Sequence, residues 1–132
     1  MAYAYSSALW IAAQGAALTL IKGGASAPTI KIRDSGDVLL ATAVIDETGS
    51  TCSATTGDIS FAIATQEASA DASGTAAYAQ ICDGDGTVHA EMDCAQGASP
   101  VAGACVMNTL TVVMGVPVDV LSATIPAGNT IV

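Results

Sequence analysis

From residue 29 onward, apolar and polar residues alternate in short runs, and segments rich in Gly, Asp, Ser and Pro separate these runs. A period of two places apolar side chains on one face of a β-strand and polar side chains on the other. In the first run, Ile30 and Ile32 share one face, whereas Lys31 and Arg33 share the other. Strands are predicted at 29–33, 38–45, 59–64, 74–82, 87–94, 105–114 and 116–125.

The clearest hairpin surrounds Asp83-Gly84-Asp85-Gly86, which lies between two alternating runs. Asp-Gly pairs in this position are typical of tight β-turns. The strand after the turn is expected to separate its residues onto two faces. One face carries Val88, Ala90, Met92 and Cys94, and the other carries Thr87, His89, Glu91 and Asp93.

Residues 6–22 are predicted to form a helix. Ser6 and Ser7 are suitable N-cap residues, and Gly23-Gly24 is a strong stop signal. Two adjoining apolar stripes appear at helical spacing: Leu9, Ala13, Ala16 and Leu20 form one, and Trp10, Ala13, Ala17 and Ile21 form the other. The apolar band is wide, which indicates burial on more than one side, against a sheet or against a neighbouring subunit.

These elements predict a mainly β fold, specifically an antiparallel β-sandwich of about seven strands with one short N-terminal helix. The 132 residues are expected to form a single domain, 1–132. It comprises an N-terminal arm at 1–5, a helix at 6–22 and the sandwich at 29–126. The arm carries Tyr3 and Tyr5, and Tyr is enriched at interfaces. The arm is therefore expected either to pack on a neighbour or to be a disordered terminus.

The charge distribution excludes several kinds of partner. The chain has 12 acidic and 3 basic residues, and all of the bases lie in the first quarter. Phosphate binding depends on Lys and Arg, so we expect no nucleic acid as a partner. We also expect no membrane, because the apolar run 8–21 is shorter than the ~20 residues of a spanning helix. No positive segment precedes this run, so a secretory signal is not predicted.

The four cysteines, Cys52, Cys82, Cys94 and Cys105, match no zinc or redox spacing. Two interpretations remain open at this point. The thiols are buried as small apolar side chains, or one or two disulfides form. In the second case Cys94–Cys105 is the most plausible pair, since a turn-rich stretch joins these residues.

No catalytic, cofactor-binding or metal-ligating residue is predicted, and the chain is not expected to be an enzyme. His89 is the single imidazole, and the alternation places it on a solvent-facing strand surface with Glu91. The chain contains no nucleophile-elbow sequence. Asp83-Gly84-Asp85-Gly86 resembles the opening of a calcium loop, but Val88 and Cys94 stand where that loop requires Gly and Glu.

Several short motifs resemble a group of small virion proteins from tailed bacteriophages. The group has a short N-terminal helix with a glycine stop, a strand of the I-K-I type, a central hairpin and a closing strand pair that ends in I-P-x-G. The corresponding segments here are 29–33, 74–78 running into 83–86, 110–112 and 125–128. The resemblance covers residues 6–128, and the chain departs from it in its four cysteines and in the loop 66–73.

This resemblance implies a non-enzymatic structural role on a virion. The expected protein is a capsid decoration, or cement, protein that binds the major capsid protein of a phage shell on its outer surface. It would be assembled in the host cytoplasm and act as a homo-oligomer, with a trimer favoured. Lys22, Lys31 and Arg33 are expected to form a basic patch that faces an acidic capsid surface. The alternatives are a tail or neck component, and a secreted or cell-surface binding module stapled by disulfides.

Overall fold

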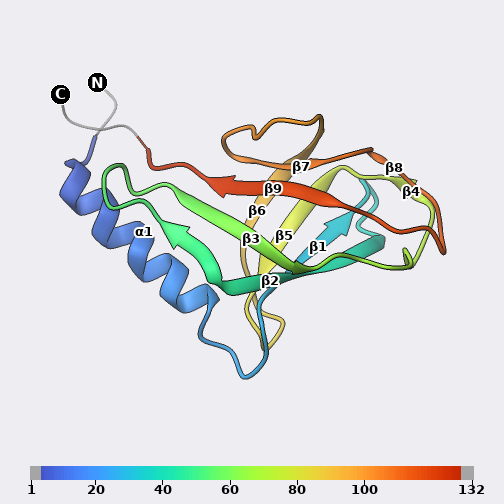
Figure 1. Ribbon diagram of the computed structural model, residues 1–132, viewed down its shortest axis with the longest axis horizontal. Helices are drawn as coiled ribbons and strands as arrows, with labels where there is room; N and C mark the ends of the chain where they lie inside the picture. Colours follow the sequence, from blue (N-terminus) through green and yellow to red (C-terminus); the bar gives the residue numbers. More distant parts are fainter. Residues whose placement is uncertain (1–3, 129–132) are drawn as a thin grey trace.

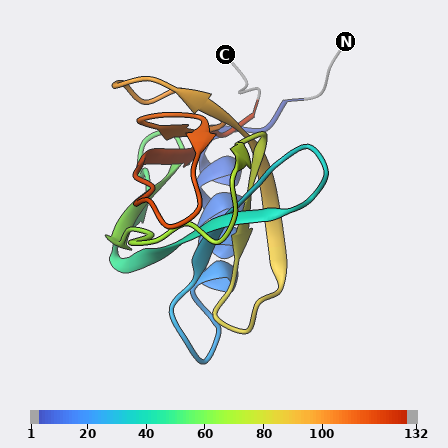
Figure 2. The same cartoon turned by 90° about the vertical axis from the view of Figure 1, so that its right-hand side faces the viewer.

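The computed structural model describes residues 4–128, which form a closed β-barrel with one helix across an end (Figures 1 and 2). The strand order around the barrel is β1-β2-β3-β9-β7-β6-β5, and β4 and β8 form a separate two-stranded sheet. The elements are α1 (Ser7–Ile21), β1 (Thr29–Arg33), β2 (Leu39–Cys52), β3 (Ile59–Thr65), β4 (Gly74–Thr75), β5 (Tyr78–Cys82), β6 (Val88–Gln96), β7 (Ala104–Met107), β8 (Thr111–Val112) and β9 (Val120–Ile125).

The mainly β class with one helix is confirmed, but the barrel replaces the predicted sandwich. A sandwich consists of two facing sheets, whereas here β1 pairs with both β2 and β5 and so closes one continuous sheet. Closure requires the strands to bend and coil, which β-bulges promote. Irregular register occurs in four of the barrel's strand pairs, including β1 with β2 and β2 with β3.

The strand β2 is longer than predicted, because it continues through the first part of the expected 46–58 loop. Its pairing with β3 steps from Asp46↔Ala62 to Thr51↔Ser60, so the intervening residues of β2 form a bulge. The buried Ser50 closes this bulge: its hydroxyl donates to the Asp46 carbonyl at 2.7 Å and accepts from the Ala62 amide at 3.0 Å. The Ser50 hydroxyl thus replaces backbone hydrogen bonds between β2 and β3, so the polar segment 46–52 remains part of the sheet.

The pairing of β6 with β7 is parallel, which differs from the predicted all-antiparallel arrangement. Parallel neighbours usually need a connection of a dozen residues or more. Here the exposed loop 97–103 turns back along β6, so that Ala104 pairs with Asp93 and Met107 pairs with Gln96. The predicted 105–114 strand is correspondingly divided into β7 and β8.

The core fills the barrel with branched aliphatic side chains. Ile30 and Ile32 are fully buried, as their alternation predicted. The largest completely buried side chains also include Leu40, Ile45, Ile59, Ile81 and Met107. Burial of each such side chain contributes roughly 1.5–3 kcal/mol, so these residues dominate the stability of a chain rich in Ala and Gly.

The helix α1 covers one end of the barrel, as both views show (Figures 1 and 2). Ser6 is its N-cap and accepts a hydrogen bond from the Leu9 amide at 3.2 Å, as predicted. Leu18 and Ile21 point into the core, whereas Leu9 and Leu20 remain 49% and 58% exposed. Within one chain, therefore, one apolar side of the helix is covered and another is not.

The Asp83–Gly86 hairpin is confirmed, and its tip packs against the connection between α1 and β1. The Asp85 carboxylate accepts from the Ala25 amide at 3.2 Å. Gly84 lies directly against the Ser26 backbone, where a Cβ would collide with the Ser26 carbonyl oxygen. This contact fixes the hairpin relative to the helix.

The two ends of the described chain lie next to each other. The Trp10 ring packs against Gly128, and the Gln14 side chain donates to the Ile125 carbonyl at 3.2 Å. Tyr5 of the predicted arm lies beside Trp10, with ring centroids 4.7 Å apart, whereas residues 1–3 lie outside the described residues. Among residues 4–128, no helix has both the length and the apolar character needed to cross a bilayer.

Candidate functional site

Six outward-facing side chains form two aligned rows across β1, β5 and β6, which we call the cross-strand surface. Ile30 and Ile32 point into the core, so the alternate residues of β1 point outward. The strand register then sets their neighbours. One row contains Lys31, Gln80 and Glu91, and the other contains Arg33, Tyr78 and Asp93.

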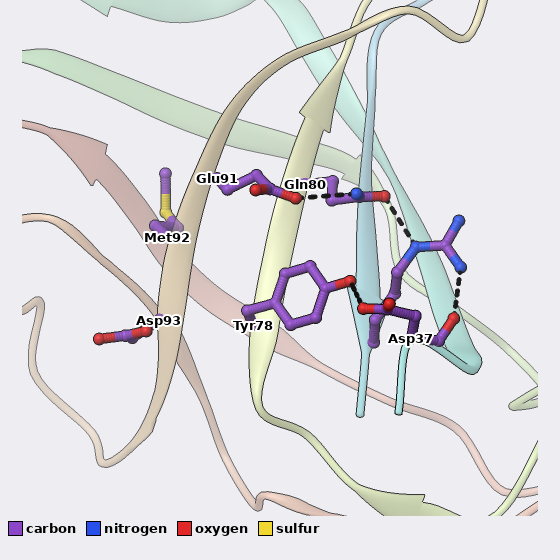
Figure 3. A pocket seen from close by; sticks show the side chains of 7 residues that line it. Asp37, Tyr78, Gln80, Glu91, Met92 and Asp93 are labelled. Carbon is purple, nitrogen blue, oxygen red and sulfur yellow. Dashed lines mark hydrogen bonds between the residues drawn. The ribbon is translucent and has the colours of Figure 1, made fainter. Parts of the chain in front are cut away.

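One hydrogen bond links the two rows diagonally and a second runs along one row (Figure 3). Arg33 Nε donates to Gln80 Oε1 at 2.7 Å, and Gln80 Nε2 donates to Glu91 Oε2 at 2.9 Å. Arg33 Nη1 also donates to the Asp37 carbonyl oxygen at 2.9 Å. The side-chain amide of Gln80 therefore bridges the Arg33 guanidinium and the Glu91 carboxylate. These hydrogen bonds hold the three long side chains in place over the sheet.

The turn between β1 and β2 supplies Asp37 to this surface. Asp34 Oδ1 accepts from the amides of Gly36 and Val38, both at 2.9 Å, and so holds the turn. Asp37 has a φ of 66°, a left-handed conformation that is uncommon for a residue other than glycine. In this conformation its carboxylate accepts a hydrogen bond from the Tyr78 hydroxyl.

This hydrogen bond raises the pKa of Tyr78 above its ordinary value, because loss of the phenolic proton would place two negative oxygens in contact. Partial burial and the charges of Asp37 and Glu91 act in the same direction, and Arg33 opposes them. Tyr78 is therefore a hydrogen-bond donor at neutral pH and not a nucleophile.

The cross-strand surface borders a shallow hollow of about 730 Å³. Its lining residues are Arg33, Asp37, Tyr78, Gln80, Glu91, Met92 and Asp93. This lining contains no Ser, Thr, Cys or His, so it offers neither an ordinary nucleophile nor an imidazole base. It presents a mixed set of fixed donors and acceptors, which suits recognition of another polar surface.

The prediction that Lys22, Lys31 and Arg33 form one basic patch is wrong for Lys22, whereas Lys31 and Arg33 do share the outward face of β1. Lys22 ends the helix, and its ammonium donates to the Ser50 carbonyl at 2.8 Å, near the far end of β2. Lys31 instead pairs with Thr42, in the first half of the same strand. Arg33 shares its hollow with three carboxylates, so its charge is balanced locally.

His89 lies on β6 beside the hairpin, and its Nε2 lies 2.8 Å from Asp83 Oδ2. The hydrogen bond from His89 has the largest effect on the pKa of Asp83 and lowers it. Burial opposes this effect, and the hydrogen bonds from the amides of Thr87 and Asp85 lower the pKa further. The adjoining hollow is lined by Gln80, Val88, His89, Ala90 and Glu91 and contains no hydroxyl or thiol. His89 therefore stabilises the turn through Asp83.

The aspartate carboxylates of the acidic hairpin accept hydrogen bonds from backbone amides, within the hairpin and from Ala25. Asp83 Oδ1 accepts from the amides of Asp85 and Thr87, at 2.9 and 3.0 Å. Within residues 4–128, no group of three or more His, Cys, Asp and Glu side chains is arranged to hold a metal ion.

The four cysteines are all unpaired as thiols. Cys82 is buried, which raises the pKa of its thiol. Cys52 is half-buried near the helix, and its Sγ lies 3.5 Å from the Gly57 carbonyl oxygen. Cys94 and Cys105 occupy opposite positions of the parallel β6–β7 pair. Cys94 and Cys105, the most plausible disulfide pair in the sequence, are thus neighbours in the structure, but no disulfide joins them.

The cross-strand surface was not predicted from the sequence as a site. Its signal was present in part, because the hairpin at Asp83–Gly86 and the alternation in β6 place Glu91 and Asp93 on one face. The neighbouring β1 row could not be added without knowing that β1 pairs with β5.

Comparisons with protein-family models, with curated proteins and with solved structures gave no match to this chain.

Proposed function

We propose that this chain is a non-enzymatic virion protein of a tailed bacteriophage, a decoration protein that binds the assembled head. Such a protein stabilises the shell by mass action, because it binds the assembled lattice and not the dispersed subunits. The observation that carries the proposal is the cross-strand surface. It is a fixed array of interface-type side chains, and it contains no reactive group of its own.

Arg and Tyr contribute disproportionately to binding energy at protein interfaces. Arg33 and Tyr78 lie side by side in the surface and are already held by Gln80 and Asp37. A pre-ordered side chain loses less conformational entropy on binding. These features support contact with a complementary polar face of the major capsid protein.

The first test is the copy number of this chain relative to the major shell protein. It is measured by quantitative mass spectrometry on purified particles of the phage that encodes it. A ratio near one, or a simple fraction of one, supports a decoration protein arrayed over the lattice. A few copies per particle would assign the chain to the tail or neck, and absence from the particle would overturn both virion roles.

The second test is binding to heads that lack the protein. Arg33→Ala is expected to weaken binding about 10-fold or more if Arg33 is a central contact. Lys22→Ala is the matched control, because it removes a base whose ammonium donates to Ser50, away from the surface. Equal loss of binding in both variants would contradict the assignment of the cross-strand surface as the contact.

The same proposal includes a homo-oligomer, with a trimer favoured, and assigns the helix to its interface. The segment Ser7–Ile21 contains no charged residue. In a chain with a net charge of −9, two copies can approach along this helix without bringing helix carboxylates together. Its exposed stripe consists of Leu9, Ala13, Ala16 and Leu20.

Oligomeric state is tested by analytical ultracentrifugation of the full chain. The wild type is expected to sediment as a trimer and Leu20→Asp as a smaller species. Val116→Asp is the control, because Val116 is an exposed apolar residue in the β8–β9 connection. A monomeric wild type, or equal dissociation of both variants, would remove the helix from the proposal.

A further inference from the structure

Cys94 and Cys105 are directly opposite each other on neighbouring strands. They are in register in the parallel β6–β7 pair. Neighbouring strands lie about 4.8 Å apart, and a disulfide joins residues whose Cα atoms are about 4.4–6.8 Å apart. The backbone spacing of this pair therefore already suits an S–S bond.

Both side chains point to the same side of the sheet. Cys105 belongs to the buried core together with Met107, and Cys94 packs against that core. The Cys105 thiol is the side-chain neighbour with the largest effect on the pKa of Cys94, so the two thiols interact. Among the described pairings, Cys82 lies opposite Thr29 and Val88, and Cys52 lies opposite Ile59. Neither of the other two thiols therefore has a cysteine as its paired neighbour.

The two thiols also differ in accessibility and acidity. Cys94 is half-buried, whereas Cys105 is completely buried. The hydrogen bond from Cys105 lowers the pKa of Cys94, and the same bond together with burial raises the pKa of Cys105. A thiolate is the attacking species in thiol–disulfide exchange, so Cys94 is suited to attack and Cys105 to complete the exchange.

We propose that Cys94 and Cys105 are a redox pair that a small-molecule disulfide oxidises to an intramolecular disulfide across the β6–β7 seam. The Cys94 thiolate attacks one sulfur of the small disulfide, forms a mixed disulfide and releases one thiolate. Cys105 then loses its proton, attacks Cys94 sulfur and releases the second small thiol. The protein loses two S–H bonds and gains one S–S bond, and the reagent is reduced to two thiols.

A disulfide between Cys94 and Cys105 would stabilise the parallel β6–β7 pair. The β6–β7 pair is the parallel join of the barrel, and its strands are connected by the exposed loop 97–103. An S–S bond across a loop of this length is expected to shift the unfolding equilibrium about 100-fold toward the folded state. Oxidation would thus lock the closed barrel after the chain leaves a reducing compartment.

The experiment uses the full chain, purified with reductant and then exposed to oxidised glutathione. The reduced protein is expected to titrate all of its thiols under denaturing conditions, and the oxidised protein two fewer. Peptide mapping without reductant is expected to link Cys94 to Cys105. Retention of every thiol, or a bond that involves Cys52 or Cys82, would overturn the proposal.

Two variants test the order of the steps. Cys105→Ala is expected to stop at the mixed disulfide on Cys94, and Cys94→Ala is expected to prevent reaction at this seam. Cys105 lies in the core, so its variant is first checked for folding by circular dichroism. The wild-type peptide map decides the outcome if that variant does not fold. The proposal is independent of the virion role, since neither thiol belongs to the cross-strand surface.

Discussion

A single glycine fixes the hairpin tip against the helix connection. The position of Gly84 against the Ser26 backbone leaves no space for a methyl group. We expect Gly84→Ala to lower the free energy of unfolding by about 1–3 kcal/mol, the usual cost of overpacking. Urea denaturation measures this difference. Gly97→Ala is the control, because a Cβ at Gly97 meets no atom within 4 Å. A loss of equal size in both variants would show that the contact is not responsible.

The Asp83–His89 pair predicts a pH dependence of stability. The folded-state pKa of Asp83 is lowered, so its contribution is present above the ordinary value of about 4 and is lost as pH falls through the folded-state pKa. Asp83→Asn keeps the Oδ1 acceptor for the turn amides but removes the charge. We expect this variant to be less stable than wild type at pH 7, with the difference shrinking below about pH 4.

This prediction is checked by urea unfolding midpoints of both proteins at neutral and acidic pH. Asp119→Asn is the control, because Asp119 is exposed and its carboxylate accepts no side-chain hydrogen bond within residues 4–128. A constant difference between Asp83→Asn and wild type across the whole pH range would contradict a role for the charge.

At the scale of elements, the helix contributes to stability through its inward side. Leu18 is 6% exposed and belongs to the core at the covered end of the barrel. We expect Leu18→Ala to cost about 2–5 kcal/mol, as is usual for truncation of a buried leucine. Leu121→Ala is the matched control because Leu121 is 48% exposed, and it is expected to change stability far less. Thermal and urea unfolding measure both variants.

The elements that the sequence predicted well are those specified by local signals. The helix bounds agree to within a residue or two, and β1 matches its predicted range, since capping, glycine stops and alternation are properties of adjacent residues. The predicted loop at 46–58 failed in its first half because Ser50 supplies hydrogen bonds from its side chain. That compensation depends on β3, which no local pattern reveals.

The whole molecule is a barrel because two pairings between strands far apart in the sequence, β1–β5 and β3–β9, act together with the parallel β6–β7 pair to close it. The β1–β5 pair and the parallel β6–β7 pair join strands whose partners cannot be read from alternation, since alternation gives faces and not neighbours. A short loop also favoured an antiparallel return at 97–103. The cross-strand surface could not be predicted for the same reason. Its two bases lie on β1 and two of its carboxylates lie on β6, and these strands come together only through their pairing with β5.

The proximity of the two ends of the described part of the chain predicts that the barrel tolerates circular permutation. Trp10 and Gln14 contact the last described residues, so a short Gly/Ser linker from residue 132 to residue 1 should not strain the fold. We expect a permutant opened between Ser99 and Pro100, in the exposed loop, to fold with a loss of about 2 kcal/mol or less.

The control permutant is opened between Gly84 and Asp85, where the hairpin tip packs on Ala25 and Ser26. It is expected to be clearly less stable in urea denaturation. If the Ser99–Pro100 permutant fails to fold while the control folds, the 97–103 loop itself maintains the parallel join.

Closure of the barrel has a consequence for how copies of this chain can associate. An open sheet ends in strands whose backbone groups can pair with another molecule and so extend into fibres. Each of the seven barrel strands has two partners, so a neighbouring copy finds no vacant backbone ladder in that sheet. Contacts between copies of this chain then depend on side chains and not on backbone pairing. This favours oligomers of limited size over fibres. Conversely, rupture of the β6–β7 seam would expose two strand edges at once and convert a self-limiting molecule into an aggregating one.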